Sequence, residues 1–204
     1  MKRRRKEAGF SLIEALVVIA IILILAGAAI VQIGPSLQRS KAETALETTL
    51  GQLRLAHQTA IDQRKILMVT FTAPRTISIA QVTIDATTGL QTTVPISSID
   101  LPSETQFTVV SGVPTQNGKT PDGLGTASNA IDFGLDYGGG QTTVYFQRDG
   151  RATDSAGRLN DGVVYISIPG DLNSSRAVTV LGATGRVKGW QILSANSNTE
   201  WRPL

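Results

Sequence analysis

The chain contains no cysteine, a single histidine and few aromatic side chains. Without cysteine it has no disulfide, no thiolate metal ligand and no thiol nucleophile. His57 is the single histidine, so a histidine metal site or catalytic dyad would require carboxylates to converge on it. The aspartates lie mostly beside Gly, Asn or Ser, as turn residues do, and no Gly-x-Ser-x-Gly motif occurs. We therefore expect no enzyme: no catalytic residues, no metal and no cofactor.

The excess of positive charge is confined to the start of the chain. Residues 1–9 carry five basic side chains and one glutamate, so the formal net charge of +3 falls to −1 when these residues are removed. The remaining chain is no bulk polycation that would attract nucleic acid through its net charge. Binding of nucleic acid would therefore have to come from a local patch.

A long apolar run follows the basic cluster and extends from Ala15 to Val31. A helix over residues 10–33 would be about 36 Å long at 1.5 Å per residue, enough to cross a hydrocarbon core of about 30 Å. The positive-inside rule then assigns residues 1–9 to the cytoplasm and the bulk of the chain to the other side. Glu14 is the exception in this segment, because a charge within a membrane costs about 3 kcal/mol on insertion scales. Such a carboxylate needs a partner of opposite charge.

The segment Gly9-Phe10-Ser11-Leu12-Ile13-Glu14 resembles the class III signal of type IV pilins and pseudopilins. In that pattern a short basic leader ends in Gly, Phe follows the cleavage point, and Glu stands at the fifth position after it. The resemblance implies that a prepilin peptidase of the inner membrane cuts between Gly9 and Phe10 and methylates the new amino group. It also implies that Glu14 neutralises the Phe10 ammonium of a neighbouring subunit during filament assembly.

Two other interpretations of this segment remain open. An ordinary secretory signal peptide also has a basic start and an apolar stretch, and residues 26–29 offer small side chains to a signal peptidase. The apolar run, however, is longer than the usual 7–15 residues, and a glutamate within it is unexpected. A plain membrane anchor explains the length but not the Gly-Phe-x-x-x-Glu pattern.

Beyond the apolar run the periodicity changes twice. Apolar residues recur at spacings of three and four along residues 42–60, which indicates an amphipathic helix whose apolar face needs a partner. From Ile66 onward, period-two alternation predicts strands over residues 66–72, 76–84, 142–147, 163–168, 177–181 and 186–192. Residues 111–129 are rich in Gly and Pro and predict a long exposed loop.

These patterns predict an α+β fold with a long N-terminal helix, half membrane-spanning and half amphipathic, packed on a C-terminal antiparallel β-domain. The expected segments are a leader at residues 1–9, a transmembrane helix at 10–33, an amphipathic helix at 34–64 and a periplasmic β-domain at 65–204.

The last sixty residues are similar to the GspH/FimT branch of the pilin superfamily. The similarity lies in the aromatic strand at residues 144–147, the apolar strand at 163–168, and a final hairpin with Arg176 and Gly185-Arg186. This resemblance implies a minor pseudopilin of a type II secretion system, a single-pass inner-membrane protein with its C-terminal domain in the periplasm. Its implied partners are other pilin or pseudopilin subunits, the prepilin peptidase and secreted protein substrates.

The alternative is a FimT-like minor type IV pilin that acts in pilus biogenesis or DNA uptake. In such pilins a Gly-Arg-x-Arg element of the last hairpin is implicated in DNA capture, and this chain has Lys188 at its last position. Lysine lacks the planar fork of arginine, so the match is incomplete. Arg176, Arg186 and Lys188, with Arg202 and the two tryptophans nearby, are the candidate DNA-binding residues. A hairpin whose charges are simply solvated explains the same residues.

We predict that the protein recovered from membranes begins at N-methylated Phe10, and that this form disappears in cells without prepilin peptidase. N-terminal sequencing and intact mass measure both. A start near Ala29, or an intact Met1, would contradict the prediction and favour an anchored or secreted β-domain.

Overall fold

The computed structural model describes the chain except for residues 1–10, 86, 88, 116–118 and 196–197, and the side chains of residues 28–33, 35, 195 and 198. The chain divides into two units between Leu37 and Gln38. One helix, α1, spans Leu12–Asp62, and its helical conformation continues through Gly34 and Pro35.

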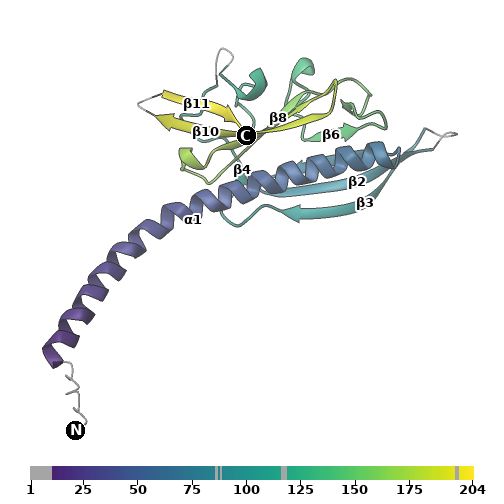
Figure 1. Ribbon diagram of the computed structural model, residues 1–204. Helices are drawn as coiled ribbons and strands as arrows, with labels where there is room; N and C mark the ends of the chain where they lie inside the picture. Colours follow the sequence, from purple (N-terminus) through teal and green to yellow (C-terminus); the bar gives the residue numbers. More distant parts are fainter. Residues whose placement is uncertain (1–10, 86, 88, 116–118, 196–197) are drawn as a thin grey trace, which may run out of the picture. The chain divides into compact units, whose positions relative to one another are not determined.

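The strands and short 3₁₀ helices follow α1 in the order shown in Figure 1. They are β1 (Ile66–Thr72), β2 (Thr76–Ile84), β3 (Gln91–Asp100), β4 (Gln106–Phe107), η1 (Pro121–Gly123), β5 (Ile131–Phe133), η2 (Leu135–Tyr137), β6 (Thr143–Phe146), β7 (Ala152–Thr153), β8 (Gly162–Ser167), η3 (Leu172–Ser174), β9 (Arg176–Leu181), β10 (Arg186–Ala195) and β11 (Asn198–Pro203).

The part of α1 in the first unit exposes apolar side chains around its whole circumference. Its leucines, isoleucines and valines from Leu12 to Leu25 are between 46% and 81% exposed. A helix that is apolar on all sides requires a non-aqueous or protein environment. Among the residues whose side chains are described, no helix combines the length and the hydropathy needed to cross a membrane.

In the second unit, α1 buries one face against the β-domain. The predicted face is confirmed, because each of its members is at most 3% exposed: Ala42, Leu46, Leu50, Leu53, Ala56 and Ala60. All of them except Ala42 share one core cluster with side chains of both sheets, including Val69 of β1 and Val178 of β9. The helix and the two sheets therefore form one hydrophobic core.

Both sheets are antiparallel throughout their described pairings. One sheet has the order β3-β2-β1-β6-β7, and the other has the order β11-β10-β9-β8-β4, with β5 also paired to β8. The outer strand β3 contains Pro95 and a register shift opposite Ile79 and Ala80. Both features discourage the pairing of a further strand at an exposed edge. The predicted α+β class, a helix packed on an antiparallel β-domain, is confirmed.

Three local predictions were incomplete or wrong. Two strands were not predicted. Strand β7 is only two residues long, and strand β11 lacks clean alternation of apolar and polar residues. The segment 111–129 is not a fully exposed loop, since Val113, Thr120 and Ala127 are at most 9% exposed. Val113 and Ala127 instead cover the second sheet, in a smaller core cluster with Tyr165, Trp190 and Trp201.

Two leucines of α1 test the packing of the helix on the sheets. Leu53 is fully buried, whereas Leu55 is 53% exposed on the same helix. We predict that Leu53→Ala lowers the free energy of unfolding by about 2–5 kcal/mol, because it removes a buried side chain and leaves a cavity. Leu55→Ala should change it by no more than about 0.5 kcal/mol. Chemical denaturation followed by tryptophan fluorescence measures both, and equal losses would contradict the packing.

Candidate functional site

The candidate residues of the C-terminal hairpin divide between the two faces of its sheet. Successive side chains of a strand point to opposite faces. A side chain at Gly189 would meet Leu50 of α1, so this position of β10 faces the helix. Arg186, Lys188 and Trp190 therefore share the other, outward face. Sequence order alone could not assign these faces.

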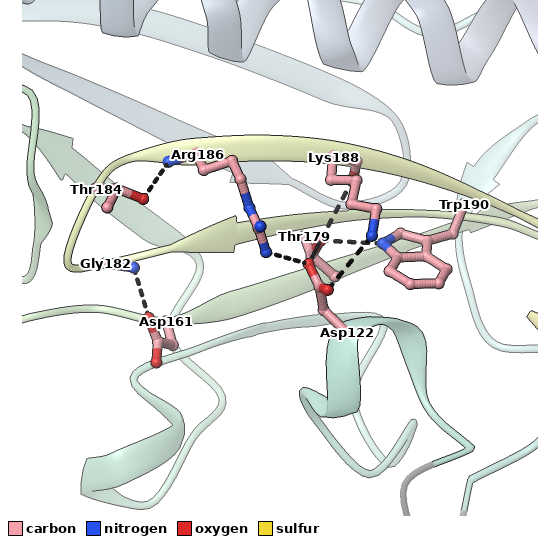
Figure 2. A network of polar contacts seen from close by, with 8 residues as sticks. All are labelled: Asp122, Asp161, Thr179, Gly182, Thr184, Arg186, Lys188 and Trp190. Atoms are coloured by element: carbon pink, nitrogen blue, oxygen red, sulfur yellow. Dashed lines mark hydrogen bonds and ion pairs between the residues drawn. The ribbon is translucent and has the colours of Figure 1, made fainter. Parts of the chain in front are cut away.

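Asp122 of η1 pairs with both basic side chains on the outward face (Figure 2). Its Oδ2 lies 3.1 Å from Nη2 of Arg186, and its Oδ1 lies 3.6 Å from Nζ of Lys188. Asp122 has left-handed backbone angles, with φ 54° and ψ 14°. One carboxylate thus faces two cations, and the cluster keeps a single net positive charge.

A hydrogen-bonded chain extends the cluster to Trp190. Thr179 of β9 donates its hydroxyl to Asp122 Oδ2 at 3.1 Å and accepts a hydrogen bond from Trp190 Nε1, also at 3.1 Å. Lys188 Nζ lies 4.2 Å from the centre of the Trp190 ring, a cation–π distance. A groove of about 450 Å³ lies beside these residues and is lined in part by Lys119, Asp122 and Trp190.

Trp190 and Trp201 present little stacking surface. Each is only 9% exposed, and both belong to the smaller core cluster. The two tryptophans that lie near the candidate DNA-binding residues in sequence therefore offer little open ring surface to a nucleic acid, because residues of the segment 111–129 pack in the same cluster. Arg202 does not join the cluster either, since it forms hydrogen bonds with Glu200.

Arg176 is separated from Arg186 and Lys188. It lies opposite Gln191 in the pairing of β9 with β10, so it shares the helix-facing side of the sheet. Its side chain is 7% exposed and its Nε lies 3.3 Å from Glu43 Oε2 on α1. The grouping of Arg176 with the other two basic residues is thus corrected: its charge links the helix to the sheet.

His57 lies at the turn that connects β9 to β10. Its Nε2 is 2.9 Å from the carbonyl oxygen of Gly150, and its ring packs on Phe146 with centroids 5.3 Å apart. Gly185 has a φ of +63°, and any side chain there would meet the carbonyl of Gly150 and the His57 ring. Both residues therefore hold the hairpin turn against α1.

Tyr165 belongs to the packed interior beneath the outward face. Its ring centroid lies 5.8 Å from that of Trp201, and its hydroxyl has no hydrogen-bond partner among the described residues. Burial, and secondly the charge of Asp132, raise the pKa of Tyr165 far above its ordinary value. The phenol therefore stays neutral at physiological pH. Within the described ranges, no three His, Asp or Glu side chains are placed to bind a metal.

Glu14 lies in the first turn of α1, and its side chain is exposed. A carboxylate there is favoured by the positive end of the helix dipole. Within the described part of the chain, no cation pairs with it. The predicted cleavage and methylation residues, Gly9 and Phe10, lie outside the described residues.

The N-terminal segment matches a known family. Residues 4–30 match the family described as "Prokaryotic N-terminal methylation motif". The matched range contains Gly9, Phe10 and Glu14, so the resemblance of this segment to prepilin-type proteins is confirmed. Residues 4–30 of the chain therefore carry a prokaryotic N-terminal methylation motif, a prepilin-type signal. No curated protein matches the chain.

Two solved structures resemble the chain at low sequence identity. The type IV minor pilin FimU of Pseudomonas aeruginosa (strain PAO1) is 14% identical, with 79% of this chain and 93% of that chain covered and a TM-score of 0.42. The minor pseudopilin EpsH from the type 2 secretion system of Vibrio cholerae is 12% identical, with 80% and 96% covered and a TM-score of 0.34. Similarity at this level supports no argument about function.

The Asp122 cluster predicts how the hairpin responds to loss of one charge. Asp122→Asn frees Arg186 and Lys188 from their shared counter-ion, so we predict stronger retention on a heparin column at low salt. An exposed ion pair contributes about 0.2–1 kcal/mol, which corresponds to an increase in affinity of about 1.4- to 5-fold.

Asp136→Asn is the matched control, because Asp136 is exposed, lies outside the cluster and changes the net charge equally. Equal retention of the two variants would mean that total charge, and not the release of Arg186 and Lys188, determines binding.

Proposed function

We propose that this protein is a minor pseudopilin of a type II secretion system, a subunit of its periplasmic filament that takes part in protein secretion. The observation that carries the proposal is a prepilin-type motif at the start of a helix with apolar side chains exposed all round and one carboxylate, Glu14. Such a helix favours assembly in a membrane and then in a filament core.

In this proposal the leader of residues 1–9 is removed by a prepilin peptidase after Gly9, and Phe10 becomes the methylated N-terminus. Residues 10–33 anchor the chain in the bacterial inner membrane by a single pass, with the N-terminus in the cytoplasm. The amphipathic helix of residues 34–64 and the β-domain of residues 65–204 lie in the periplasm. The role is assembly, with no catalysis and no cofactor.

Glu14 has a specific physical task in this assembly. A carboxylate in an apolar medium is costly unless a cation neutralises it, and the free amine of Phe10 on a neighbouring subunit is such a cation. Subunits would therefore enter the filament in the register that pairs these two groups. The partners that this implies are other pilin or pseudopilin subunits, with secreted proteins as the transported substrates.

A second candidate function is that of a FimT-like minor type IV pilin in pilus biogenesis or DNA uptake. The observation that favours it is the outward face on which Arg186, Lys188 and Trp190 lie together. Asp122 opposes it, because it already neutralises part of the charge that DNA phosphates would need. Arg176, which is buried and paired with Glu43, drops out of this candidate site.

Glu14 variants test the proposed assembly. We predict that Glu14→Ala and Glu14→Gln are cleaved after Gly9 as efficiently as the parent, but enter the filament about tenfold less or worse. Unpairing a buried charge costs several kcal/mol, whereas cleavage needs only the leader signal. Immunoblots of isolated filament and membrane fractions measure both steps.

Glu47→Ala is the matched control, since Glu47 is an exposed glutamate of the same helix. Normal filament entry by both Glu14 variants would remove the charge-pairing argument. Loss of entry in Glu47→Ala as well would point to a general effect of helix charge.

A further inference from the structure

A small polar pocket lies where the second unit begins. It has a volume of about 220 Å³, and among its lining residues are Arg39 of α1, Arg176 of β9, and Gln191 and Ser194 of β10. Pockets that enclose a whole small molecule measure roughly 300–1,000 Å³. This one has room for a single polar group, not for a whole ligand.

Two guanidinium groups line the pocket and differ in the number of their contacts. Arg176 is fixed, because its Nε faces Glu43 and its Nη1 donates to the backbone carbonyls of Asn173 and Ser175 at 3.0 Å each. Arg39 is exposed and has no ion-pair partner among the described residues. Glu43 can balance only one of these two charges, so the pocket favours an anion.

The donors of the pocket fit a phosphate group. Arginine presents its N–H groups in a planar fork that matches phosphate oxygens, and hydrogen bonds between ions are stronger than neutral ones. The side-chain amide of Gln191, which shares the face of Arg176 in the pairing of β9 with β10, adds a neutral donor around the same space. Leu193, which also lines the pocket, is 37% exposed and offers an apolar contact at its rim.

The position of Arg39 in the sequence identifies the source of the phosphate. Arg39 follows Ile33, the last residue of the expected transmembrane helix, by only six residues. Six residues span at most about 22 Å even when fully extended. If residues 10–33 cross the membrane, Arg39 is therefore within reach of the headgroup region, where basic pockets bind anionic lipids.

We propose that this pocket binds the phosphodiester headgroup of an anionic phospholipid. The inference rests on the proposed membrane anchorage of residues 10–33. Arg39 and Arg176 contact the phosphate, Gln191 adds a further hydrogen bond, and Leu193 contacts the apolar part of the lipid. The bound lipid holds the base of the β-domain at the membrane surface before assembly.

The test measures lipid retention by the full chain in detergent micelles that contain either phosphatidylglycerol or phosphatidylcholine, using native mass spectrometry. We expect preferential retention of phosphatidylglycerol by the parent. Arg39→Gln should weaken it about fivefold, the effect of one basic residue near anionic lipid. Gln191→Glu should weaken it similarly, because it adds a carboxylate beside Arg176 without removing a basic residue.

Arg54→Gln is the control, because Arg54 is exposed on the same helix outside the pocket and all three substitutions lower the net charge by one. Unchanged lipid retention in Arg39→Gln and Gln191→Glu would contradict lipid binding at this pocket. An equal loss of retention in Arg54→Gln would contradict it as well. Inorganic phosphate is added in a separate arm. If it binds with the same sensitivity to the variants and displaces phosphatidylglycerol at equal concentration, the lipid is not the ligand.

The outcome is separable from that of the proposed function. Extraction of the parent and each variant with the membrane fraction, and cleavage after Gly9, report on anchorage and processing. If the parent shows no lipid preference but anchors and enters the filament normally, only lipid binding at the pocket is refuted. If the parent is not recovered with the membrane fraction, the proposed anchorage is refuted.

Discussion

The packing of one face of α1 against both sheets is the contact on which the rest of the β-domain depends. Leu46, Leu50 and Leu53 are at most 3% exposed, and burial of each leucine contributes roughly 1.5–3 kcal/mol. Strand β10 approaches this face closely because Gly189 has no side chain to meet Leu50. The same approach decides which side chains of β10 face outward. The packing of the helix therefore determines which side chains of the hairpin are in the core and which lie on its outward face.

Charge is arranged differently on the two faces of that hairpin. On the helix side, Arg176 joins β9 to Glu43 of α1 and lies almost out of contact with water. On the outward side, Asp122 holds Arg186 and Lys188 in exposed pairs, which contribute little to stability. The helix-facing arginine thus connects elements, whereas the outward pair leaves one net charge that other molecules can meet. A basic motif in the sequence is therefore not the same as a free basic surface.

The two parts of α1 have different requirements for a partner. The second part buries its apolar face within its own domain, but the first part exposes apolar side chains on every side. Those side chains, and the carboxylate of Glu14 among them, need surroundings that the described part of this chain does not supply. A lipid bilayer and neighbouring helices are surroundings of that kind. Under the proposed function, assembly into a filament meets this need.

Much of the local structure could be read from periodicity. Spacings of three and four predicted the buried face of α1, and period-two alternation predicted strands such as β1 and β2, because one side of each meets the core. The strand β11 lacks that alternation and was missed. The burial of Val113 and Ala127 was missed as well, because loop composition carries no information about what a loop covers.

The N-terminal motif, the apolar run with Glu14 and the order of helix and strands were determined by the sequence itself, since each depends on residues close together in the chain. The partners of the charged residues were decided only by the tertiary structure. Asp122 and Arg186 are 64 positions apart, and Arg176 and Glu43 are 133 apart. Coulomb attraction weakens with distance and is screened by salt, so only the folded arrangement of helix, loop and sheet brings these charges close enough to pair.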